Sequence, residues 1–494
     1  MYLFKARQVW YYAPIFIGIC LYLYIIIRAF TVSMTHDEVN TCIIYARQPF
    51  WDIVNYTDPI PNNHIFHTLL VKLSEMLFGI SQVTVRIPNL LAFSIYLFSA
   101  FGFMRYCTEN NYIRAFAFCA LLLNPFLIDF FSLARGYALS IDFMLAACLA
   151  AYYHLQQPQT RYLTTAVVLS ILAPYSNFTT LNFYAPFTAL LLLFTIQESV
   201  LLNNKTEKIK RLLKHSGIIL GGAIVLAVIS YTPIHKMMAT DQLRFWGSSG
   251  FYEDTLKSLT YMCLDGQAYI HKLEITVTVF SIFIVIFLGV LYAALSINLW
   301  NKKAQLLRNP FAFFGLLLFG AITSVIVQFH LLGTLYVNSR TALFYYPLFM
   351  LGAIFFLIQL TKLFPNSSKR FILPLTLFII LHFARTVNLK NASEWWYNQN
   401  DKQVLAYVEQ QYLNTQRTEP ITLNADWAFI PTLIFYDQTD SLQWVSVTPW
   451  HMDIDTSGNY EYYYVESKNL EALQHKYEPV LSFEWNGRVL LKRK

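Results

Sequence analysis

Charged residues and cysteines are both scarce in this chain. Only 13% of its 494 residues are charged, whereas 56% are hydrophobic, and a soluble domain usually has about a quarter of its residues charged. A single soluble globule is therefore excluded. The six cysteines form no Cys-x-x-Cys metal spacing. Cys42 and Cys263 are expected on the outer side of a membrane, where a disulfide between them could form.

The sequence contains many long apolar segments with few charged residues in them. Segments of about 17 to 25 residues, the length that crosses about 30 Å of hydrocarbon, recur along the first four-fifths of the chain. We expect eleven membrane-spanning helices, near residues 10–30, 86–105, 112–130, 137–154, 161–176, 178–198, 213–232, 274–299, 310–332, 341–361 and 370–386. The first is expected to be retained, because no small-residue cleavage site precedes Thr31.

The basic residues indicate the orientation of these helices. Every second connection is rich in lysine and arginine, as in residues 205–214, and the opposite connections have fewer basic residues for their length. We therefore expect a cytoplasmic N-terminus and an extracytoplasmic C-terminus. With no organelle-targeting or retention signal, the predicted location is a bacterial inner (cytoplasmic) membrane. The net charge of +7 comes mostly from these loops and indicates no nucleic-acid partner.

Three segments outside the predicted spans are long enough to hold a site. Residues 31–85 contain two interfacial helices, predicted at 46–55 and 64–78, and residues 233–273 form a second outer loop. The polar tail marks a domain boundary, with a membrane domain over 1–386 and an extracytoplasmic α/β domain over 387–494. In the tail, 401–412 has helical spacing, and 421–423, 442–447 and 460–465 are β-prone. Asn486-Gly487 predicts a hairpin between 481–485 and 489–491.

Two adjacent carboxylates, Asp37 and Glu38, follow the first apolar segment by a few residues. A carboxylate near the bilayer surface can serve as a general base, because partial desolvation raises its pKa toward neutrality. A solvated helix end explains the pair equally well from its position alone. Downstream, Asn62 and Asn63 follow Pro61 and fit a turn and a helix cap.

His64 and His67, three residues apart, would share one face of an interfacial helix. With Glu38 they could bind a divalent cation. Polar decoration of the helix surface is the more ordinary explanation, so the sequence establishes no cofactor.

Arginines in the outer connections suit an anionic lipid headgroup. Arg135 lies in a short outer turn among apolar residues, and Arg340 lies in another. A guanidinium there can bind a phosphate through paired, charge-assisted hydrogen bonds, although an ion pair with a nearby carboxylate explains either arginine alone. The candidates for binding the donor phosphate and lipid are Arg135, Arg340, Arg86, Arg244, Tyr137 and Tyr345.

Three short motifs occur in order on the same predicted side of the membrane. They are Asp37-Glu38, the stretch from Leu77-Phe78-Gly79 to Arg86-Ile87-Pro88, and Ala134-Arg135-Gly136-Tyr137. Together they resemble GT-C-fold glycosyltransferases of the protein O-mannosyltransferase-like group, which includes bacterial lipid A aminoarabinose transferases. The resemblance covers the order of features over the membrane region and the outer C-terminal domain.

The resemblance implies inverting transfer of a sugar from a polyprenyl-phosphate carrier to an acceptor at the outer membrane face. Asp37 matches the acidic residue that deprotonates or orients the acceptor, with Glu38 beside it. A protein hydroxyl, lipid A, another glycan and a lipid all fit as acceptors. Where many relatives have a Lys-Pro-Pro-like element, this chain has residues 62–67, from Asn62 to His67. Asn63, His64 or His67 would then take the place of the lysine, and the donor sugar stays open.

Two other classes of protein are compatible with the composition. A lipid or polysaccharide transporter or flippase would show repeated halves or charges in mid-span, but the sequence has no repeat and few acidic residues in its spans, Asp142 being the clearest. A non-catalytic subunit for envelope assembly would use the C-terminal domain to bind a partner. The glycosyltransferase is the interpretation that the three motifs favour.

Overall fold

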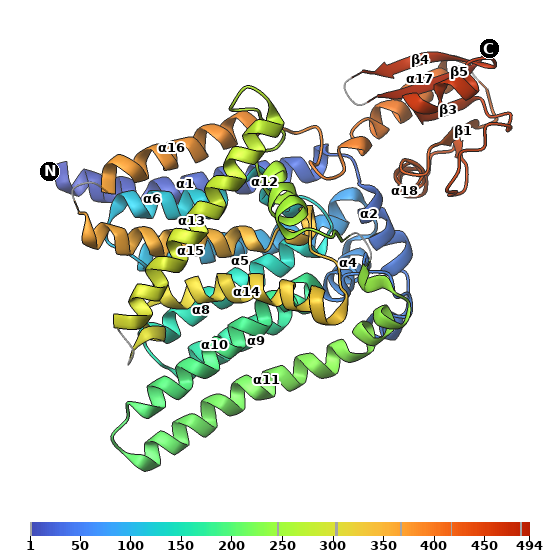
Figure 1. Ribbon diagram of the computed structural model, residues 1–494. Coiled ribbons are helices and arrows are strands. Elements are labelled where there is room, and N and C mark those ends of the chain that lie inside the picture. The colour runs from blue at the N-terminus through green and yellow to red at the C-terminus, as the bar shows by residue number, and fades with distance from the viewer. Residues whose placement is uncertain (1, 245–246, 302–304, 366–367, 416, 485–486) are drawn as a thin grey trace. The chain divides into compact units, whose positions relative to one another are not determined.

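The computed structural model describes residues 2–244, 247–301, 305–365, 368–415, 417–484 and 487–494. The chain forms two compact units. The first consists of Met1–Ile26, Phe50–Leu69 and Pro88–Val387, and the second consists of Ile27–Pro49, Leu70–Ile87 and Asn388–Lys494. The second unit therefore combines the C-terminal tail with two segments from the first outer loop and its neighbouring helix ends. Figure 1 shows the chain coloured from its N-terminus to its C-terminus.

Long apolar helices make up most of the first unit. Among the described residues, eight helices are long and apolar enough to cross a membrane. They are α1 (Tyr2–Thr31, apolar from Tyr12), α5 (Gln82–Tyr106), α8 (Gly136–Gln156), α10 (Leu181–Val200, after the 3-10 turn η2, Phe178–Thr180), α11 (Lys205–Ala239), α13 (Leu273–Asn301), α14 (Pro310–Leu332) and α15 (Tyr345–Leu363, after the 3-10 turn η6, Ser339–Ala342). The chain is a multi-pass membrane protein, as its composition predicts.

The predicted span over 112–130 is broken into two helices. α6 (Asn111–Leu122) and α7 (Pro125–Phe131) meet at an angle of 57°. Pro125 has no N–H to continue the helix, and the side chain of Asn124 instead accepts a hydrogen bond from the Leu127 N–H, at 2.9 Å, and starts a new one. If this bent pair counts as one span, the described chain has nine.

Two further predicted spans are helical but are less clearly spanning. α9 (Thr160–Ser176) has 17 residues, the lower limit for crossing about 30 Å of hydrocarbon. α16 (Ser368–Thr386) contains Lys369, Arg370 and Arg385. All eleven predicted segments are thus helical, but the count of eleven spans is not confirmed.

α8 lies at the centre of the first unit, and nearly all of its side chains are buried. Its many small residues, such as Ala146, Ala147 and Ala150, let neighbouring helices approach closely. Asp142 is among its fully buried side chains. α14 and α15 run side by side in Figure 1, and α14 also packs against α10 and α13.

Several connections between the long helices contain short helices. After α1, α2 (His36–Val39) runs into the π-helical turn η1 (Asn40–Tyr45), followed by α3 (Phe50–Val54) and α4 (Ile65–Phe78). α3 and α4 confirm the two helices expected at 46–55 and 64–78. The connection after α11 contains η3 (Gln242–Arg244), η4 (Phe251–Leu256) and α12 (Lys257–Cys263), and η5 (Leu306–Arg308) precedes α14. All six cysteines are free thiols, and Cys42 and Cys263 lie in different units.

The tail of the second unit is an α/β domain, as predicted. Its five-stranded sheet has the order β2-β1-β3-β5-β4. β1 (Ile421–Ala425) pairs in parallel with β2 (Val445–Val447) and β3 (Tyr462–Glu466), whereas β5 (Arg488–Arg493) pairs antiparallel with β3 and β4 (Tyr477–Phe483). The β4–β5 pairing confirms the predicted hairpin, although Asn486 itself lies outside the described residues.

Helices connect the strands of this domain. They are η7 (Trp396–Asn398), α17 (Asp401–Thr415), α18 (Ile430–Asp440), η8 (Ser467–Asn469) and α19 (Leu470–Leu473). A core of buried aromatic and aliphatic side chains, including Tyr463, Tyr477 and Leu491, lies between the antiparallel strands and α19.

Candidate functional site

The acidic pair lies on a tightly capped first helical turn. The Thr35 hydroxyl accepts a hydrogen bond from the Glu38 N–H at 3.3 Å, and the Glu38 carboxylate accepts one from the Thr35 N–H at 2.9 Å. This reciprocal capping box fixes the start of α2. Glu38 is completely buried, whereas Asp37 is partly exposed on the same turn. The π-helical turn that follows is a local irregularity that is frequent at functional sites.

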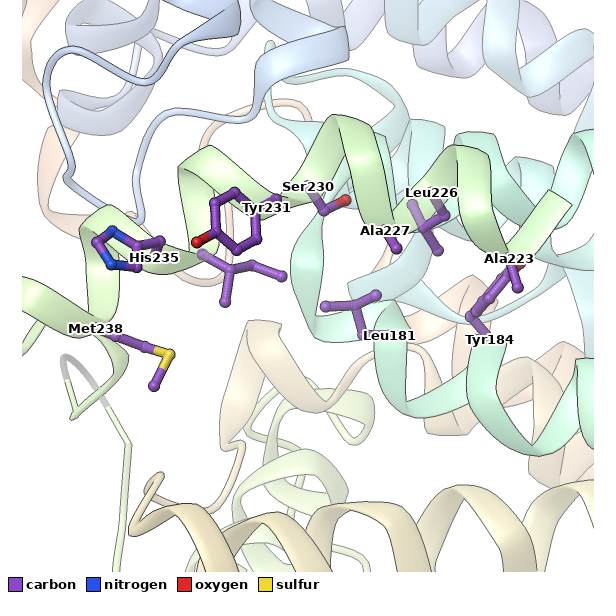
Figure 2. Close-up of a pocket in the computed structure, with 10 residues that line it drawn as sticks. Leu181, Tyr184, Ala223, Leu226, Ala227, Ser230, Tyr231, His235 and Met238 are labelled. Atoms are coloured by element: carbon purple, nitrogen blue, oxygen red, sulfur yellow. The ribbon is translucent and has the colours of Figure 1, made fainter. Parts of the chain in front are cut away.

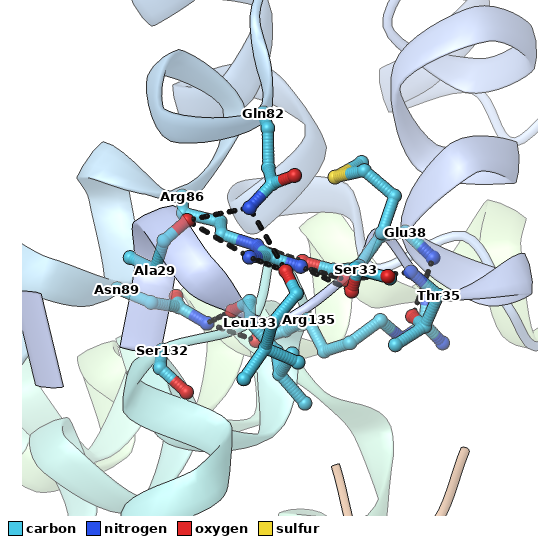
Figure 3. Close-up of polar contacts among 12 residues, drawn as sticks. Ala29, Ser33, Thr35, Glu38, Gln82, Arg86, Asn89, Ser132, Leu133 and Arg135 are labelled. Carbon is cyan, nitrogen blue, oxygen red and sulfur yellow. Dashed lines mark hydrogen bonds and ion pairs between the residues drawn. The ribbon is translucent and has the colours of Figure 1, made fainter. Parts of the chain in front are cut away.

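Arg86, near the start of α5, holds the Glu38 carboxylate. Its Nε and Nη2 donate to the two carboxylate oxygens of Glu38, each at 2.8 Å. Its remaining N–H groups donate to the carbonyl oxygens of Ala29, Val32 and Ser33 at 2.8–3.0 Å. All five guanidinium N–H groups are therefore used within the second unit, and Figure 3 shows Arg86 among these partners.

Arg135 is the N-cap residue of α8 in the first unit, and its side chain is almost completely buried. Its guanidinium donates to the Asn62 carbonyl oxygen at 3.2 Å and to the Asn62 side-chain oxygen, and it lies 3.1 Å from His64 Nε2. It also lies over the Tyr137 ring, 5.9 Å from the centroid. The structure thus brings together four sequence-predicted candidates: Arg135, Asn62, His64 and Tyr137.

Hydrogen bonds from Asn89 and close packing at Gly136 fix the turn that carries Arg135. The Asn89 amide donates to the carbonyl oxygen of Phe130 and to those of Leu133 and Arg135, and Figure 3 shows Asn89 with the last two residues. A Cβ at Gly136 would clash with the Ser176 carbonyl oxygen and with the His64 side chain. The turn therefore depends on glycine at this position.

Two neutral histidines adjoin Arg135. Burial, with Arg135, His67 and Arg340 nearby, holds the pKa of His64 well below its usual value. Burial and Arg135 lower the pKa of His67 to about 3. Neither ring nitrogen of His67 has a hydrogen-bond partner among the described residues. Arg340, in η6, contributes to the lowered pKa of His64 after burial, Arg135 and His67.

The remaining candidates lie apart from this cluster or have structural partners. The Asn63 side-chain oxygen accepts a hydrogen bond from the Thr68 hydroxyl at 3.0 Å. Arg244 is exposed, lies 3.6 Å from Asp241 and donates to the Gly333 carbonyl oxygen at 3.3 Å.

No metal cluster is found in the described ranges of the chain. These ranges hold no group of three or more His, Cys, Asp or Glu side chains arranged around one ion. Of the residues suggested for a cation site, His64 and His67 lie in the first unit and Glu38 lies in the second. Glu38 binds Arg86 instead, and the His64 Nε2 faces Arg135.

A large apolar cavity of about 500 Å³ lies in the first unit. Tyr345 lines it, and the hydroxyl of Tyr345 donates to the Ala321 carbonyl oxygen at 3.3 Å. Its walls come from η4, α12, α13, α15 and α16, with aromatic side chains such as Phe287 and Phe378. A cavity of this size and lining suits a hydrocarbon chain.

A second apolar pocket of about 440 Å³ lies between α10 and α11 (Figure 2). Tyr184 and Ser230 line it, and their hydroxyl groups are buried without a hydrogen-bond partner in the part of the chain that the structure describes. Tyr231 and His235, toward the end of α11, line its exposed rim.

Sequence reasoning missed Asn89 as a residue of this site. Asn89 is fully buried in an apolar segment, and an amide there has to be hydrogen-bonded. Its position just after Arg86-Ile87-Pro88 was the available signal. Which backbone it would bond could not be read from the sequence, because its partners lie 41–46 residues away.

Solved structures with a similar fold cover nearly the whole chain. The crystal structure of ArnT from Cupriavidus metallidurans bound to undecaprenyl phosphate matches with a TM-score of 0.51 and 11% identity, over 98% of this chain and 97% of ArnT. The apo ArnT structure gives 0.49 and 12%, over 98% of each chain. The oligosaccharyltransferase AglB from Archaeoglobus fulgidus, in complex with an inhibitory peptide and a dolichol-phosphate, gives 0.47 and 10%, over 94% of this chain and 70% of AglB.

The similarity to the undecaprenyl-phosphate-bound ArnT structure shows the fold. No protein-family model and no curated protein sequence matches the chain. The match to ArnT, a lipid A aminoarabinose transferase, confirms the GT-C glycosyltransferase fold that the three sequence motifs predict. At 11% identity the match describes the path of the chain and leaves the reaction to be argued from the residues.

Proposed function

We propose that this protein is an inverting glycosyltransferase. It moves a sugar from a polyprenyl-phosphate carrier to an acceptor at the outer face of the membrane. The GT-C fold supports the class of reaction, and the residues described above support the roles within it.

The observation that carries the proposal is the difference in burial between Glu38, which is paired with Arg86, and Asp37. Glu38 is completely buried and held on both oxygens by Arg86, so it is poorly placed to exchange a proton with a substrate. Asp37, its neighbour on the same capped turn, keeps part of its surface exposed. A general base has to reach the proton that it removes. We therefore assign Asp37 as the base and Glu38 as the residue that fixes the turn.

The first unit supplies the proposed phosphate contacts. The leaving polyprenyl phosphate carries negative charge, which cations stabilise as the bond to the sugar breaks. Arg135 and Arg340 are the proposed cations. Arg86 is not assigned this role, because all its N–H groups donate to protein atoms. Arg244 is not assigned it either, because its side chain is exposed beside Asp241.

The polar residues around Arg135 have supporting roles in this proposal. Asn62 and His64 hold its guanidinium, and Asn63 and His67 lie on the same short segment. With low pKa values, His64 and His67 stay neutral near neutral pH and add no further positive charge. Together these residues would take the place of the Lys-Pro-Pro-like element of related enzymes.

The cavity of about 500 Å³ is the proposed site for the start of the donor's hydrocarbon tail. Its apolar walls would bury prenyl units, and moving these apolar units out of water is favourable. Tyr345, the first residue of α15, lines this cavity and follows the last residue of η6, the turn that contains Arg340, by three positions.

In the proposed reaction, the acceptor oxygen attacks the anomeric carbon from the face opposite the phosphate. The bond between that carbon and the phosphate oxygen breaks, and the configuration at the carbon is inverted. Asp37 takes the acceptor proton, and the electron pair of the broken bond leaves with the polyprenyl phosphate. A protein hydroxyl, lipid A, another glycan and a lipid all supply a suitable nucleophile. The proposed location is an inner membrane, with the C-terminal domain outside the cytoplasm.

Transfer from a labelled donor tests this function. The purified protein is given undecaprenyl phosphate carrying one radiolabelled sugar at a time, with an envelope extract as the source of acceptors. We expect label to move into the extract, and Asp37→Asn to reduce turnover on the order of 10²-fold to 10⁴-fold, the usual contribution of a general base. Asp52→Asn, in α3 of the same outer segment, is the matched control and is expected to keep wild-type turnover.

Two results would overturn the proposal. One is the absence of transfer from every donor sugar tested. The other is wild-type turnover in Asp37→Asn protein that has the melting temperature of the wild type, which would remove the base assignment.

A further inference from the structure

The first backbone N–H of α2 is bound by a side chain from the far end of the sequence. His36 is the first residue of the helix, so its N–H has no partner within the helix. The side-chain oxygen of Asn398 accepts this N–H at 3.2 Å. Asn398 belongs to η7, at the start of the α/β domain, and both residues lie in the second unit.

The orientation of the Asn398 amide is determined by its own partners. Its NH₂ group donates to Asp401 Oδ2 at 2.9 Å, to the Thr432 hydroxyl oxygen at 3.2 Å and to the Ala428 carbonyl oxygen at 3.3 Å. A flipped amide would turn its oxygen toward the Ala428 oxygen and its NH₂ toward the His36 N–H. Only the observed orientation satisfies both sides.

Burial makes this arrangement costly to disturb. Asn398 has 1% of its surface exposed and Asp401 has none. Burial raises the pKa of Asp401 well above its usual value. A buried polar group that loses its partner is left without a hydrogen bond, because water does not reach it.

Asp37 lies between two anchored residues. On one side, His36 is tied to Asn398, and its ring lies 5.3 Å from the Trp427 ring. On the other side, Glu38 is tied to Arg86. The backbone that carries the Asp37 side chain is thus fixed on both sides, once by α5 and once by the C-terminal domain.

A further contact ties the same segment to the domain. The Met34 N–H donates to the Tyr436 hydroxyl at 2.9 Å, and that hydroxyl donates to the Gln82 side-chain oxygen at 2.9 Å. The domain therefore holds the chain at Met34, just before α2, and at His36, the first residue of α2.

We propose that Asn398 is a positioning residue for Asp37, and that Asp401 holds Asn398 in the orientation which this role requires. The proposal rests on the function proposed above. It gives the C-terminal domain a part in the reaction, because the domain completes the turn that carries the base. A displacement of about 1 Å in a reacting group can lower the rate on the order of 100-fold, so a loosened turn is expected to lower kcat.

Kinetics of Asn398→Ala test the proposal. We expect kcat to fall about tenfold or more, with an unchanged KM for the undecaprenyl-phosphate-linked sugar, because donor contacts are assigned to other residues. Asn469→Ala is the matched control. It removes an amide of the same domain that donates to Asp426 Oδ1 at 2.7 Å, and it is expected to leave kcat unchanged. Asp401→Leu is expected to behave like Asn398→Ala, and Asp401→Asn to keep most of the activity, since it retains an acceptor oxygen.

A double-mutant cycle separates positioning from loss of folded protein. In the Asp37→Asn background, Asn398→Ala is expected to have no further effect on the residual rate, because the group that it positions is already gone. A variant that merely lowers the amount of folded enzyme would reduce the rate by the same factor in both backgrounds. An equal factor in both, or wild-type kcat in Asn398→Ala, would overturn the positioning role.

Hydrogen exchange supplies a readout that does not depend on activity. Exchange in a peptide covering residues 34–39 is expected to quicken in Asn398→Ala and to stay at the wild-type rate in Asn469→Ala. Unchanged exchange in Asn398→Ala would show that the contact does not hold the turn. If the wild type transfers no sugar, the proposed function fails and the positioning role fails with it. If it transfers sugar while Asn398→Ala matches the wild type, only the positioning role fails.

Discussion

Arg86 binds both oxygens of the Glu38 carboxylate at 2.8 Å, in an ion pair in which neither side chain has any exposed surface. The pair joins the start of α5 to the first turn of α2. It also explains why two adjacent carboxylates have different surroundings. Glu38 is completely buried and paired with Arg86, whereas Asp37 on the same turn is partly exposed.

Breaking this pair on one side should cost far more than removing it from both sides. Arg86→Met leaves the Glu38 charge buried and unpaired, which is expected to lower the free energy of unfolding by about 3–5 kcal/mol. The double variant Arg86→Met/Glu38→Gln removes that charge and is expected to recover part of the loss. Melting temperatures in one detergent measure both. Arg161→Met, at an exposed arginine, is the control. A wild-type melting temperature for Arg86→Met would show that the pair does not stabilise the fold.

Arg135→Lys should weaken donor binding even though it keeps the charge. The guanidinium of Arg135 contacts Asn62 and His64 at the same time, and a lysine ammonium cannot reproduce that planar geometry. We expect the dissociation constant for undecaprenyl phosphate to rise about tenfold, the equivalent of about 1.4 kcal/mol. The measurement is equilibrium binding to the purified protein, and Arg161→Lys is the control. Equal affinity in Arg135→Lys and the wild type would remove Arg135 from the proposed phosphate contacts.

The two buried histidines should make the protein less stable in acid. His67 has a pKa of about 3 in the folded protein and about 6.5 when unfolded. Its stabilising contribution is therefore complete above about pH 6.5 and is lost as the pH falls toward about 3, because only the unfolded chain takes up the proton over that range. The melting temperature should fall less between about pH 7 and about pH 5 in His67→Gln than in the wild type. His475→Gln, at an exposed histidine, should match the wild type. An equal fall in His67→Gln would contradict the lowered pKa.

Glu75 should have the opposite effect from His67 and make the protein less stable as the pH rises. Burial raises its pKa from 4.5 to about 7, although Arg47 and Lys72 oppose the shift. The folded protein holds this proton over a range in which the unfolded chain has lost it, so stability is lost as the pH rises from 4.5 to about 7. Glu75→Gln should therefore melt at a higher temperature than the wild type at about pH 8 and at the same temperature at about pH 4.5. Glu409→Gln, at an exposed glutamate, should change neither value. A lower melting temperature for Glu75→Gln at the higher pH would refute the raised pKa.

The sequence predicts the helices of this protein well, because apolar length is a strong and local signal. The prediction from apolar length was wrong where a helix cap interrupts an apolar run. Asn124 and Pro125 end one helix and begin another inside an apolar run. In the tail, α18 was not predicted, because Ile434, Phe435 and Tyr436 are β-prone residues that the domain places in a helix.

The candidate site was predictable in its residue types but not in its division of labour. The sequence identifies Asp37, Glu38 and Arg86 as unusual, yet nothing local to them shows that Arg86 binds Glu38 across 48 residues. The same holds for Asn398, which is an ordinary polar residue in the tail until its contact with His36 is known. Long-range contacts of this kind have no signature in a single sequence.

The contact between His36 and Asn398 joins residues that are 362 positions apart. A chain made from its N-terminus inserts its long helices well before residue 398 is synthesised. Until the tail has folded, the first N–H of α2 has no acceptor from Asn398, and the turn that carries Asp37 lacks this anchor. The contact between His36 and Asn398 can therefore form only after most of the chain has been synthesised. A chain that ends before Asn398 would lack one of the two anchors of the turn that carries the proposed base.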